Sequence, residues 1–233
     1  MDHCECPSRQ EFVYTAQFCE ENVYLGCQRL TEELGWMHAL AVFVTNPSHV
    51  TPMLCQRSSK SPEGLVFWDY HVFMVASARE PCHWLVFDWD TTIKPFPCPL
   101  EEYVQRTFGF RFKDPGTQAL LDSLTFRIVP WCELRDTFRS DRSHMLDEQG
   151  HPLAPFPPYP CIGVVSHEDH CATTPCTNLF STFVDMSLPG SPTSPSEQDC
   201  PTVGTVVEGA EELVRHILSS CPAEQHQQPP SPE

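Results

Sequence analysis

The sequence predicts an α+β fold with a mainly antiparallel sheet, on three observations. Helical and strand patterns follow one another in mixed order, without the strand–helix–strand rhythm of a parallel sheet. Hydrophobic residues make up 40% of the 233-residue chain, with 15 Phe and 5 Trp, which is enough for a sizeable core. Two long apolar runs, at residues 65–75 and 83–90, are separated by a short polar break, as in a β-hairpin.

A helix and two strands are predicted before these runs. Apolar side chains in residues 19–34 recur at steps of three and four, which indicates an amphipathic helix. Glu20 and Glu21 fall in its first turn, where the helix dipole favours carboxylates. The β-branched and aromatic run at residues 39–46 predicts a strand, and residues 50–56 predict a second, weaker one.

Further elements follow the two long runs. Residues 100–108 (LEEYVQRTF) predict a helix, and residues 125–130 (TFRIVP) predict a strand. A short helix is expected at residues 131–138. Residues 140–160 are polar and end in a proline-rich stretch, so we expect an ordered loop there.

The composition divides the chain into one large domain and several smaller segments. We expect a flexible leader at residues 1–11 and a folded domain at residues 12–186. Residues 187–205 are rich in Ser and Pro and predict a disordered linker. Residues 206–220 predict an amphipathic helix with one apolar stripe, and residues 221–233 predict a disordered tail.

Charge and cysteine usage narrow the function classes. The net charge of -17 disfavours a nucleic-acid surface. The N-terminal residues lack a secretory pattern, and no apolar run reaches the roughly 18 residues that a membrane span needs. We therefore expect a protein of the cytoplasm, with the nucleus also open, whose thiols stay reduced. Its 13 cysteines are then core residues, metal ligands or a nucleophile.

Charged and polar side chains interrupt the two long runs. Alternation puts Asp69 and His71 on one face of the first strand, and Asp88 and Asp90 on one face of the second. A hairpin centred near residues 79 and 80 pairs residues whose numbers sum to about 159, which places His71 opposite Asp88. A slip of two residues places His71 opposite Asp90. The pair is equally compatible with a buried histidine neutralised by its carboxylate and with a catalytic pair.

A cysteine at the start of the first helix supplies the third member of a catalytic set. Cys19 lies where the helix dipole lowers the pKa of a thiol, whereas Cys27 falls on the buried stripe and is expected in the core. A cysteine on a helix, with His71 and Asp88 on adjacent strands, is the arrangement of a transglutaminase/papain-like core. His71 would take the thiol proton, Asp88 would fix the imidazole tautomer, and N–H groups at the helix start would bind the oxyanion.

Five motifs, in this order and with compatible gaps, resemble the protein N-terminal glutamine amidohydrolase family. They are FCEEN (18–22), WDYHV (68–72), FDWDTTIKPFPC (87–98), FRSDRSHM (138–145) and PPYPCI (157–162). The resemblance runs from about residue 14 to residue 162, roughly two thirds of the chain. Beyond it, the Ser/Pro-rich linker and the later helix are either additions to the family pattern or strongly diverged from it.

The resemblance implies a monomeric enzyme whose catalytic domain is residues 12–186. The family converts an N-terminal glutamine of proteins and peptides to glutamate and releases ammonia, and the new terminus feeds the arginylation branch of the N-degron pathway. No metal or organic cofactor is implied. Position by position, Cys19, His71 and Asp88 match the family's catalytic residues, which favours Asp88 over Asp90.

The resemblance also implies a group that binds the free α-ammonium of the substrate, because glutamine inside a chain must be rejected. The candidates are Glu20, Glu21, Asp69, Asp90 and Asp141. Ser143 and His144 either line the cleft or only cap the segment that follows them. The sequence does not choose among them. Each is equally compatible with a purely structural role.

Three other functions stay open. Residues 161–176 offer zinc-ligand types, although their spacing fits no standard zinc finger: Cys161, His167, His170, Cys171 and Cys176. A cysteine peptidase or transglutaminase would use the same triad. An inactive homologue that binds protein N-termini is the third alternative.

Overall fold

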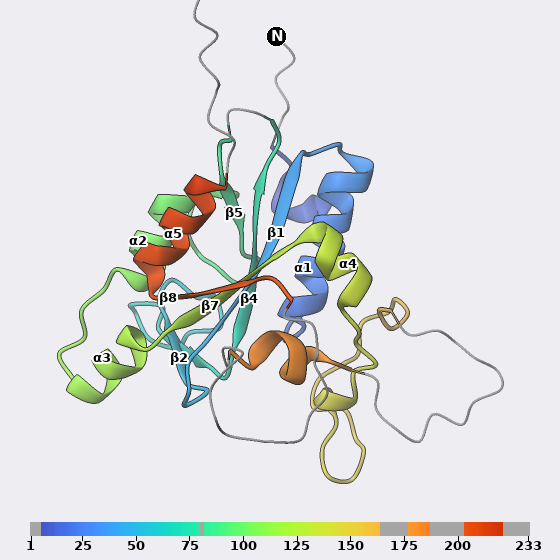
Figure 1. The fold of residues 1–233 in the computed structure, drawn as a ribbon. Coiled ribbons are helices and arrows are strands. Elements are labelled where there is room, and N and C mark those ends of the chain that lie inside the picture. The colour runs from blue at the N-terminus through green and yellow to red at the C-terminus, as the bar shows by residue number, and fades with distance from the viewer. Residues whose placement is uncertain (1–5, 80–81, 164–176, 187–202, 221–233) are drawn as a thin grey trace, which may run out of the picture.

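The computed structural model describes residues 6–79, 82–163, 177–186 and 203–220. Its centre is a six-stranded sheet in the order β6-β5-β4-β1-β7-β8, in which every neighbouring pair is antiparallel (Figure 1). The strands are β1 (His38–Thr45), β4 (His71–Ser77), β5 (Leu85–Phe87), β6 (Cys98–Pro99), β7 (Thr125–Pro130) and β8 (Thr205–Glu208). A separate two-stranded sheet pairs β2 (Thr51–Met53) with β3 (Val66–Trp68). The predicted α+β class with a mainly antiparallel sheet is confirmed.

Helices cover both faces of the main sheet (Figure 1). On one face lie α1 (Cys19–Gln28), which continues as a π-helix at Arg29–Glu33, and α4 (Trp131–Thr137). On the other lie α2 (Leu100–Phe108) and α5 (Ala210–Ser219), with α3 (Pro115–Asp122) near one end of the sheet. Alternate side chains of the strands feed two separate apolar cores, one under each helical layer. The remaining short helices are Arg9–Glu11, Ser143–Met145 and Leu179–Val184.

Local sequence patterns gave several element boundaries closely. The predicted bounds of α2 and β7 agree with the structure, and Cys27 is fully buried in the core as expected. The helix α3 was not predicted, although Asp114 caps it by accepting a hydrogen bond from the Thr117 amide and Pro115 occupies its first position. The cap and the proline, together with the short apolar stripe of residues 115–122, are the sequence signals that identify this helix.

The predicted hairpin needs two corrections. The first long strand is broken at residues 69–70 into β3 and β4, and β3 joins the smaller sheet. The β4–β5 register pairs Met74 with Phe87 and Ala76 with Leu85, so paired residue numbers sum to 161 rather than about 159. The cause is that β4 continues to Ser77, whose hydroxyl accepts a hydrogen bond from the His83 amide, so the connection is centred one residue later.

The predicted helix at residues 206–220 also needs a correction. Residues 205–208 form β8, which extends the main sheet by pairing Val207 with Phe126 of β7. The helix α5 begins only at Ala210, after Gly209 in the left-handed region at φ 79°. The β-branched run in residues 205–208 favours a strand, and its apolar residues were wrongly joined to the helical stripe.

Buried polar contacts join the chain ends to the core. The guanidinium of Arg127 in β7 donates hydrogen bonds to the carbonyls of Phe183, Asp185 and Val203 at 2.6–3.1 Å. Arg9, within the predicted flexible leader, donates to the Trp89 and Thr91 carbonyls at 2.6 and 2.9 Å. The described parts of the leader and of the C-terminal segment are thus built into the domain. Among the described residues, no helix is both long and apolar enough for a membrane span.

The helix α5 provides a test of this assignment. Leu213 is fully buried against the α2 core, whereas Leu218 on the same helix is 44% exposed. We expect Leu213→Ala to lower the free energy of unfolding by about 2 to 5 kcal/mol, because it leaves a cavity. The matched change Leu218→Ala is expected to stay within about 0.5 kcal/mol of wild type. Urea unfolding of both variants measures the difference, and equal effects would contradict the packing of α5.

Candidate active site

The core of the site is a buried histidine–aspartate pair at the end of the main sheet. His71 is the first residue of β4, and Asp88 follows the last residue of β5. His71 Nε2 lies 3.0 Å from Asp88 Oδ1, and both side chains are 1% exposed. The β4–β5 ladder ends at the Met74–Phe87 pair, and residues 89 and 90 form a turn, so Asp88 reaches the imidazole from just beyond the paired part of β5. The predicted pairing with Asp88 is confirmed, but the register that predicted it is wrong.

Asp88 is held by three further donors. Its Oδ1 also accepts a hydrogen bond from the Asp90 amide at 2.9 Å. Its Oδ2 accepts from the Tyr103 hydroxyl at 2.9 Å and from Gln56 Nε2 at 3.4 Å. These contacts orient the carboxylate and satisfy its negative charge inside the protein.

Sequence reasoning missed the residues that support this pair. The indole of Trp68 stacks on the His71 ring, with 5.4 Å between ring centroids, and its Nε1 donates to Gln56 Oε1 at 3.3 Å. Tyr103 lies on the apolar face of α2 and reads as an ordinary core residue. The nearest sequence signal is Trp68 itself, which directly precedes the DYH triplet.

The carboxylate of Asp88 makes the His71 imidazole a stronger base. Burial alone would lower the pKa of His71, but the charges of Asp88, Asp90 and Glu20 outweigh it and raise that pKa. Burial alone would raise the pKa of Asp88, but His71 and the hydrogen bonds to the carboxylate lower it. His71 Nδ1 is buried and has no hydrogen-bond partner among the described residues. That nitrogen is therefore available to exchange a proton with another group.

Cys19 is the first residue of α1 and is half-buried. Its thiol has a backbone hydrogen bond with Val72, the residue after His71, and its Sγ lies 3.5 Å from Glu20 Oε2. The helix dipole was expected to lower the pKa of this thiol, but in the free protein the net direction is upward. Burial raises the pKa of Cys19, and the charges of Glu20 and Asp90 raise it further.

The predicted substrate-binding candidates occupy different environments. Glu21 is fully buried in an ion pair with Arg142, 3.0 Å between Glu21 Oε2 and Arg142 Nη2, and its Oε1 accepts from the Ser140 hydroxyl at 2.8 Å. This pair ties the loop after α4 to α1. Asp69 is exposed in the break between β3 and β4.

The other candidates lie closer to the pair or hold the loop. Asp90 is buried, and its Oδ1 accepts a hydrogen bond from the Tyr14 hydroxyl at 2.6 Å. The ligand atoms of His71, Asp88 and Asp90 lie within 4.8 Å of one another, a spacing that a metal ion could bridge. Such an ion would have to displace the hydrogen bonds that already saturate Asp88. Half-buried Asp141 accepts from the Ser143 amide at 2.9 Å, which starts the 3-10 turn Ser143–Met145.

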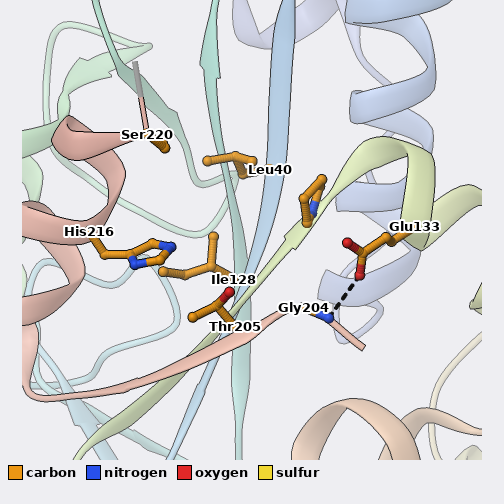
Figure 2. Close-up of a pocket in the computed structure, with 8 residues that line it drawn as sticks. Leu40, Ile128, Glu133, Gly204, Thr205, His216 and Ser220 are labelled. Carbon is orange, nitrogen blue, oxygen red and sulfur yellow. Dashed lines mark hydrogen bonds between the residues drawn. The ribbon is translucent and has the colours of Figure 1, made fainter. Parts of the chain in front are cut away.

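Two hollows differ in their relation to this site. A small one of about 190 Å³ lies between β1, β7, β8 and α5, where Gly204 N donates to Glu133 Oε2 at 2.9 Å (Figure 2). It reaches β1 at Leu40, whereas His71 pairs with Val44 at the other end of that strand. A larger cavity of about 940 Å³ is lined in part by Phe180, whose ring contacts that of Tyr70 just before His71. The larger cavity approaches the site through Phe180 and Tyr70, and its lining does not include His71, Asp88 or Cys19.

Comparison with known proteins identifies the family of the chain. The family model for N-terminal glutamine amidase matches residues 14–215. That range includes β8 and most of α5, so of the two alternatives for this segment, addition or divergence, the match contradicts addition.

Several relatives carry the name protein N-terminal glutamine amidohydrolase. The Danio rerio protein is 36% identical over 160 residues, covering 67% of this chain and 75% of that protein. The Drosophila grimshawi protein is 34% identical over 198 residues, covering 82% and 88%. The Homo sapiens protein is 33% identical over 160 residues, covering 67% and 74%. The chain therefore belongs to the N-terminal glutamine amidase family.

Proposed function

We propose that this protein hydrolyses the side-chain amide of an N-terminal glutamine, giving glutamate and ammonia, with Cys19, His71 and Asp88 as a catalytic triad on a transglutaminase/papain-like core. One observation carries the proposal. The buried imidazole of His71 is oriented by Asp88 through Nε2 and has an Nδ1 without a hydrogen-bond partner among the described residues, while the Cys19 thiol contacts the backbone of Val72, the next residue along β4. This is the pattern of a nucleophile, its base and an orienting carboxylate.

The proposed reaction has two stages. His71 Nδ1 takes the proton from the Cys19 thiol as sulfur attacks the carboxamide carbon, and the negative oxygen is stabilised by N–H groups at the start of α1. The carbon–nitrogen bond breaks as His71 returns the proton to the departing ammonia, which leaves a thioester. Water then gives a proton to His71 and attacks the thioester, and the thiol recovers that proton as glutamate is released.

The charges of the free protein fit this sequence of steps. The raised pKa of Cys19 keeps the thiol protonated until a base accepts its proton. The Asp88 carboxylate, whose pKa is lowered, stays negative and stabilises the imidazolium formed in the attack. The proposal includes a monomeric enzyme of the cytoplasm, with the nucleus also open, that needs no cofactor. Its product would enter the arginylation branch of the N-degron pathway.

The alternative functions have weaker support. A peptidase or transglutaminase would share the triad, but the relatives that match over two thirds of the chain are named for glutamine at a protein N-terminus. An inactive binding protein would have no need for an oriented His71–Asp88 pair. Most of the candidate zinc ligands lie outside the described residues, and Cys161 is the one that is described.

Ammonia release from four matched peptides tests the proposal. The peptides begin with Gln, with Asn, or with N-acetylated Gln, or carry Gln at an internal position. We expect turnover of the Gln-initiated peptide alone, because the other three place no free α-ammonium beside a glutamine carboxamide. Cleavage of a backbone bond would favour a peptidase, and tight binding of the first peptide without ammonia release would favour an inactive homologue.

A further inference from the structure

A buried carboxylate beside the nucleophile has an unused oxygen. The side chain of Glu20 is fully buried, and its Oε2 accepts a hydrogen bond from the Tyr70 hydroxyl at 3.2 Å and lies 3.5 Å from Cys19 Sγ. Its Oε1 is buried without any hydrogen bond among the described residues. A buried charged oxygen left in this state is costly, so it indicates a place where a donor from outside the chain binds.

A buried histidine faces the same oxygen. His144, in the 3-10 turn Ser143–Met145, has a side chain that is 6% exposed, and its Nε2 lies 3.3 Å from Glu20 Oε1. That contact lacks hydrogen-bond geometry, and neither ring nitrogen has a hydrogen-bond partner in the described parts of the chain. The two side chains therefore offer a carboxylate oxygen and, in the neutral imidazole, one nitrogen lone pair as acceptors. An ammonium group carries three donors and matches such a pair.

The other buried carboxylates are already engaged. Glu21 is neutralised by Arg142, and Asp88 accepts four hydrogen bonds. Asp90 accepts a tyrosine hydroxyl and raises the pKa of His71, which supports the imidazole. Asp69 is exposed. Glu20 thus differs from the other candidates in combining burial, an unbonded oxygen and contact with the thiol.

The reach of glutamine fits the distance between the two groups. Its α-nitrogen and carboxamide carbon are four bonds apart, on the order of 5 Å when extended. Glu20 Oε2 is 3.5 Å from Cys19 Sγ, and Oε1 is the other oxygen of the same carboxylate. A carboxamide carbon at Sγ and an ammonium at Oε1 are therefore within the span of one glutamine.

We propose that Glu20, assisted by His144, binds the α-ammonium of the substrate, and that this binding also activates Cys19 by cancelling the negative charge beside it. The inference rests on the proposed function and adds its specificity determinant. Selection for a free N-terminus is then part of catalysis as well as of binding, because a blocked terminus leaves the thiol next to an uncompensated carboxylate.

The electrostatics of the thiol agree with this coupling. After burial, the charge of Glu20 is the largest contribution that raises the pKa of Cys19, and Asp90 adds to it. The ionisable groups near the thiol and Glu20 are His71, Tyr70 and His144, together with Asp90. An ammonium on Glu20 offsets its charge and lowers the thiol pKa at the moment a substrate arrives.

The first test combines a substrate change with an enzyme change. The substrates are a Gln-initiated peptide and its des-amino analogue, in which hydrogen replaces the α-amino group. With wild type, we expect kcat/KM to fall by roughly 100-fold or more for the analogue, because the buried carboxylate stays unpaired. Glu20→Gln should lose a similar factor with the normal peptide and treat the two substrates within about threefold of each other. Glu32→Gln, an exposed change at Glu32 in the π-helix after α1, is the matched control and should behave as wild type.

The second test separates this role from a structural one. Glu20→Gln removes a negative charge beside the Cys19 thiol, so the pKa of that thiol falls. Iodoacetamide should then alkylate Cys19 faster than in wild type at the same pH. Mass spectrometry of the peptide that contains Cys19 measures the rate. Faster alkylation together with slower turnover supports the proposal. Two results for Glu20→Gln overturn the proposal and would favour Asp90 as the group that binds the α-ammonium. One is slower alkylation together with slower turnover. The other is a Glu20→Gln variant that discriminates between the two peptides as strongly as wild type does.

Failure of the proposed function is distinguishable from failure of this inference. Wild type that releases no ammonia from the Gln-initiated peptide removes the proposed function itself. If wild type turns over both peptides equally, the proposed function stands, but Glu20 is not the group that selects the free α-ammonium. That comparison needs no variant, so it decides the matter even if Glu20→Gln does not fold.

Discussion

Replacing Cys19 by alanine is expected to abolish ammonia release from a Gln-initiated peptide. No other group in the described site can form the covalent intermediate, so the loss should exceed about 10⁴-fold in kcat. The fold should persist, because Cys19 is half-buried and the change removes one sulfur atom at the start of α1. Thermal unfolding should therefore stay close to that of wild type, within about 1 kcal/mol.

Cys27 provides the matched control. It lies on the same helix, two turns further on, and is fully buried in the core. Cys27→Ala should destabilise the protein by about 1 kcal/mol or more through the lost packing, yet keep its turnover at temperatures where it is folded. If Cys19→Ala retained turnover, or if Cys27→Ala lost it while folded, the nucleophile would be assigned wrongly.

The candidate site was partly visible in the sequence because two of its features are local. A polar residue inside an apolar strand can be recognised within a window of ten residues. The same is true of a cysteine that precedes a helical stripe. The register was not visible, because it depends on where the connection after Ser77 is centred. His71 and Asp88 meet nevertheless, since Asp88 lies beyond the end of β5 and its side chain reaches back to the imidazole.

The charge state of the nucleophile could not be predicted in the same way. The helix dipole is a property of local backbone, but the thiol of Cys19 also experiences burial, the orientation of Glu20 and a carboxylate from a distant turn, Asp90. The supporting contacts are equally non-local. Tyr103 reaches Asp88 across 15 residues, and Arg142 reaches Glu21 across 121.

The fold shows the same division between local and distant information. Regular patterns fixed α2 and β7 well, because one period dominates each segment. Residues 205–208 carry adjacent valines that fit a strand as well as a helical stripe, and only pairing with β7 decides between them. The break of the long strand at residues 69–70 depends on tertiary structure, because the segments before and after it join different sheets.

Replacing Asp88 by asparagine is expected to be the second most damaging change. The carboxylate accepts the proton on His71 Nε2 and thereby leaves Nδ1 free as the base. In the wild type, one carboxylate oxygen of Asp88 accepts from the Asp90 amide and His71, and the other accepts from Tyr103. The asparagine in Asp88→Asn has only one oxygen, which must serve all of these donors. If the new amide group faces His71, the imidazole proton moves to Nδ1, which can then no longer accept the thiol proton. We expect kcat to fall by about 10³- to 10⁴-fold.

The neighbouring change Asp90→Asn separates orientation from charge. An asparagine there keeps an oxygen for the Tyr14 hydroxyl, and the Asp90 amide still donates to Asp88, so the pair keeps its geometry. The change removes the nearby negative charge that raises the pKa values of His71 and Cys19, and it should cost no more than about tenfold in kcat/KM. Steady-state kinetics of both variants with the Gln-initiated peptide give the ranking. A larger loss for Asp90→Asn would mean that Asp90, which has a carboxylate oxygen within 4.8 Å of a His71 ring nitrogen, orients the imidazole during turnover.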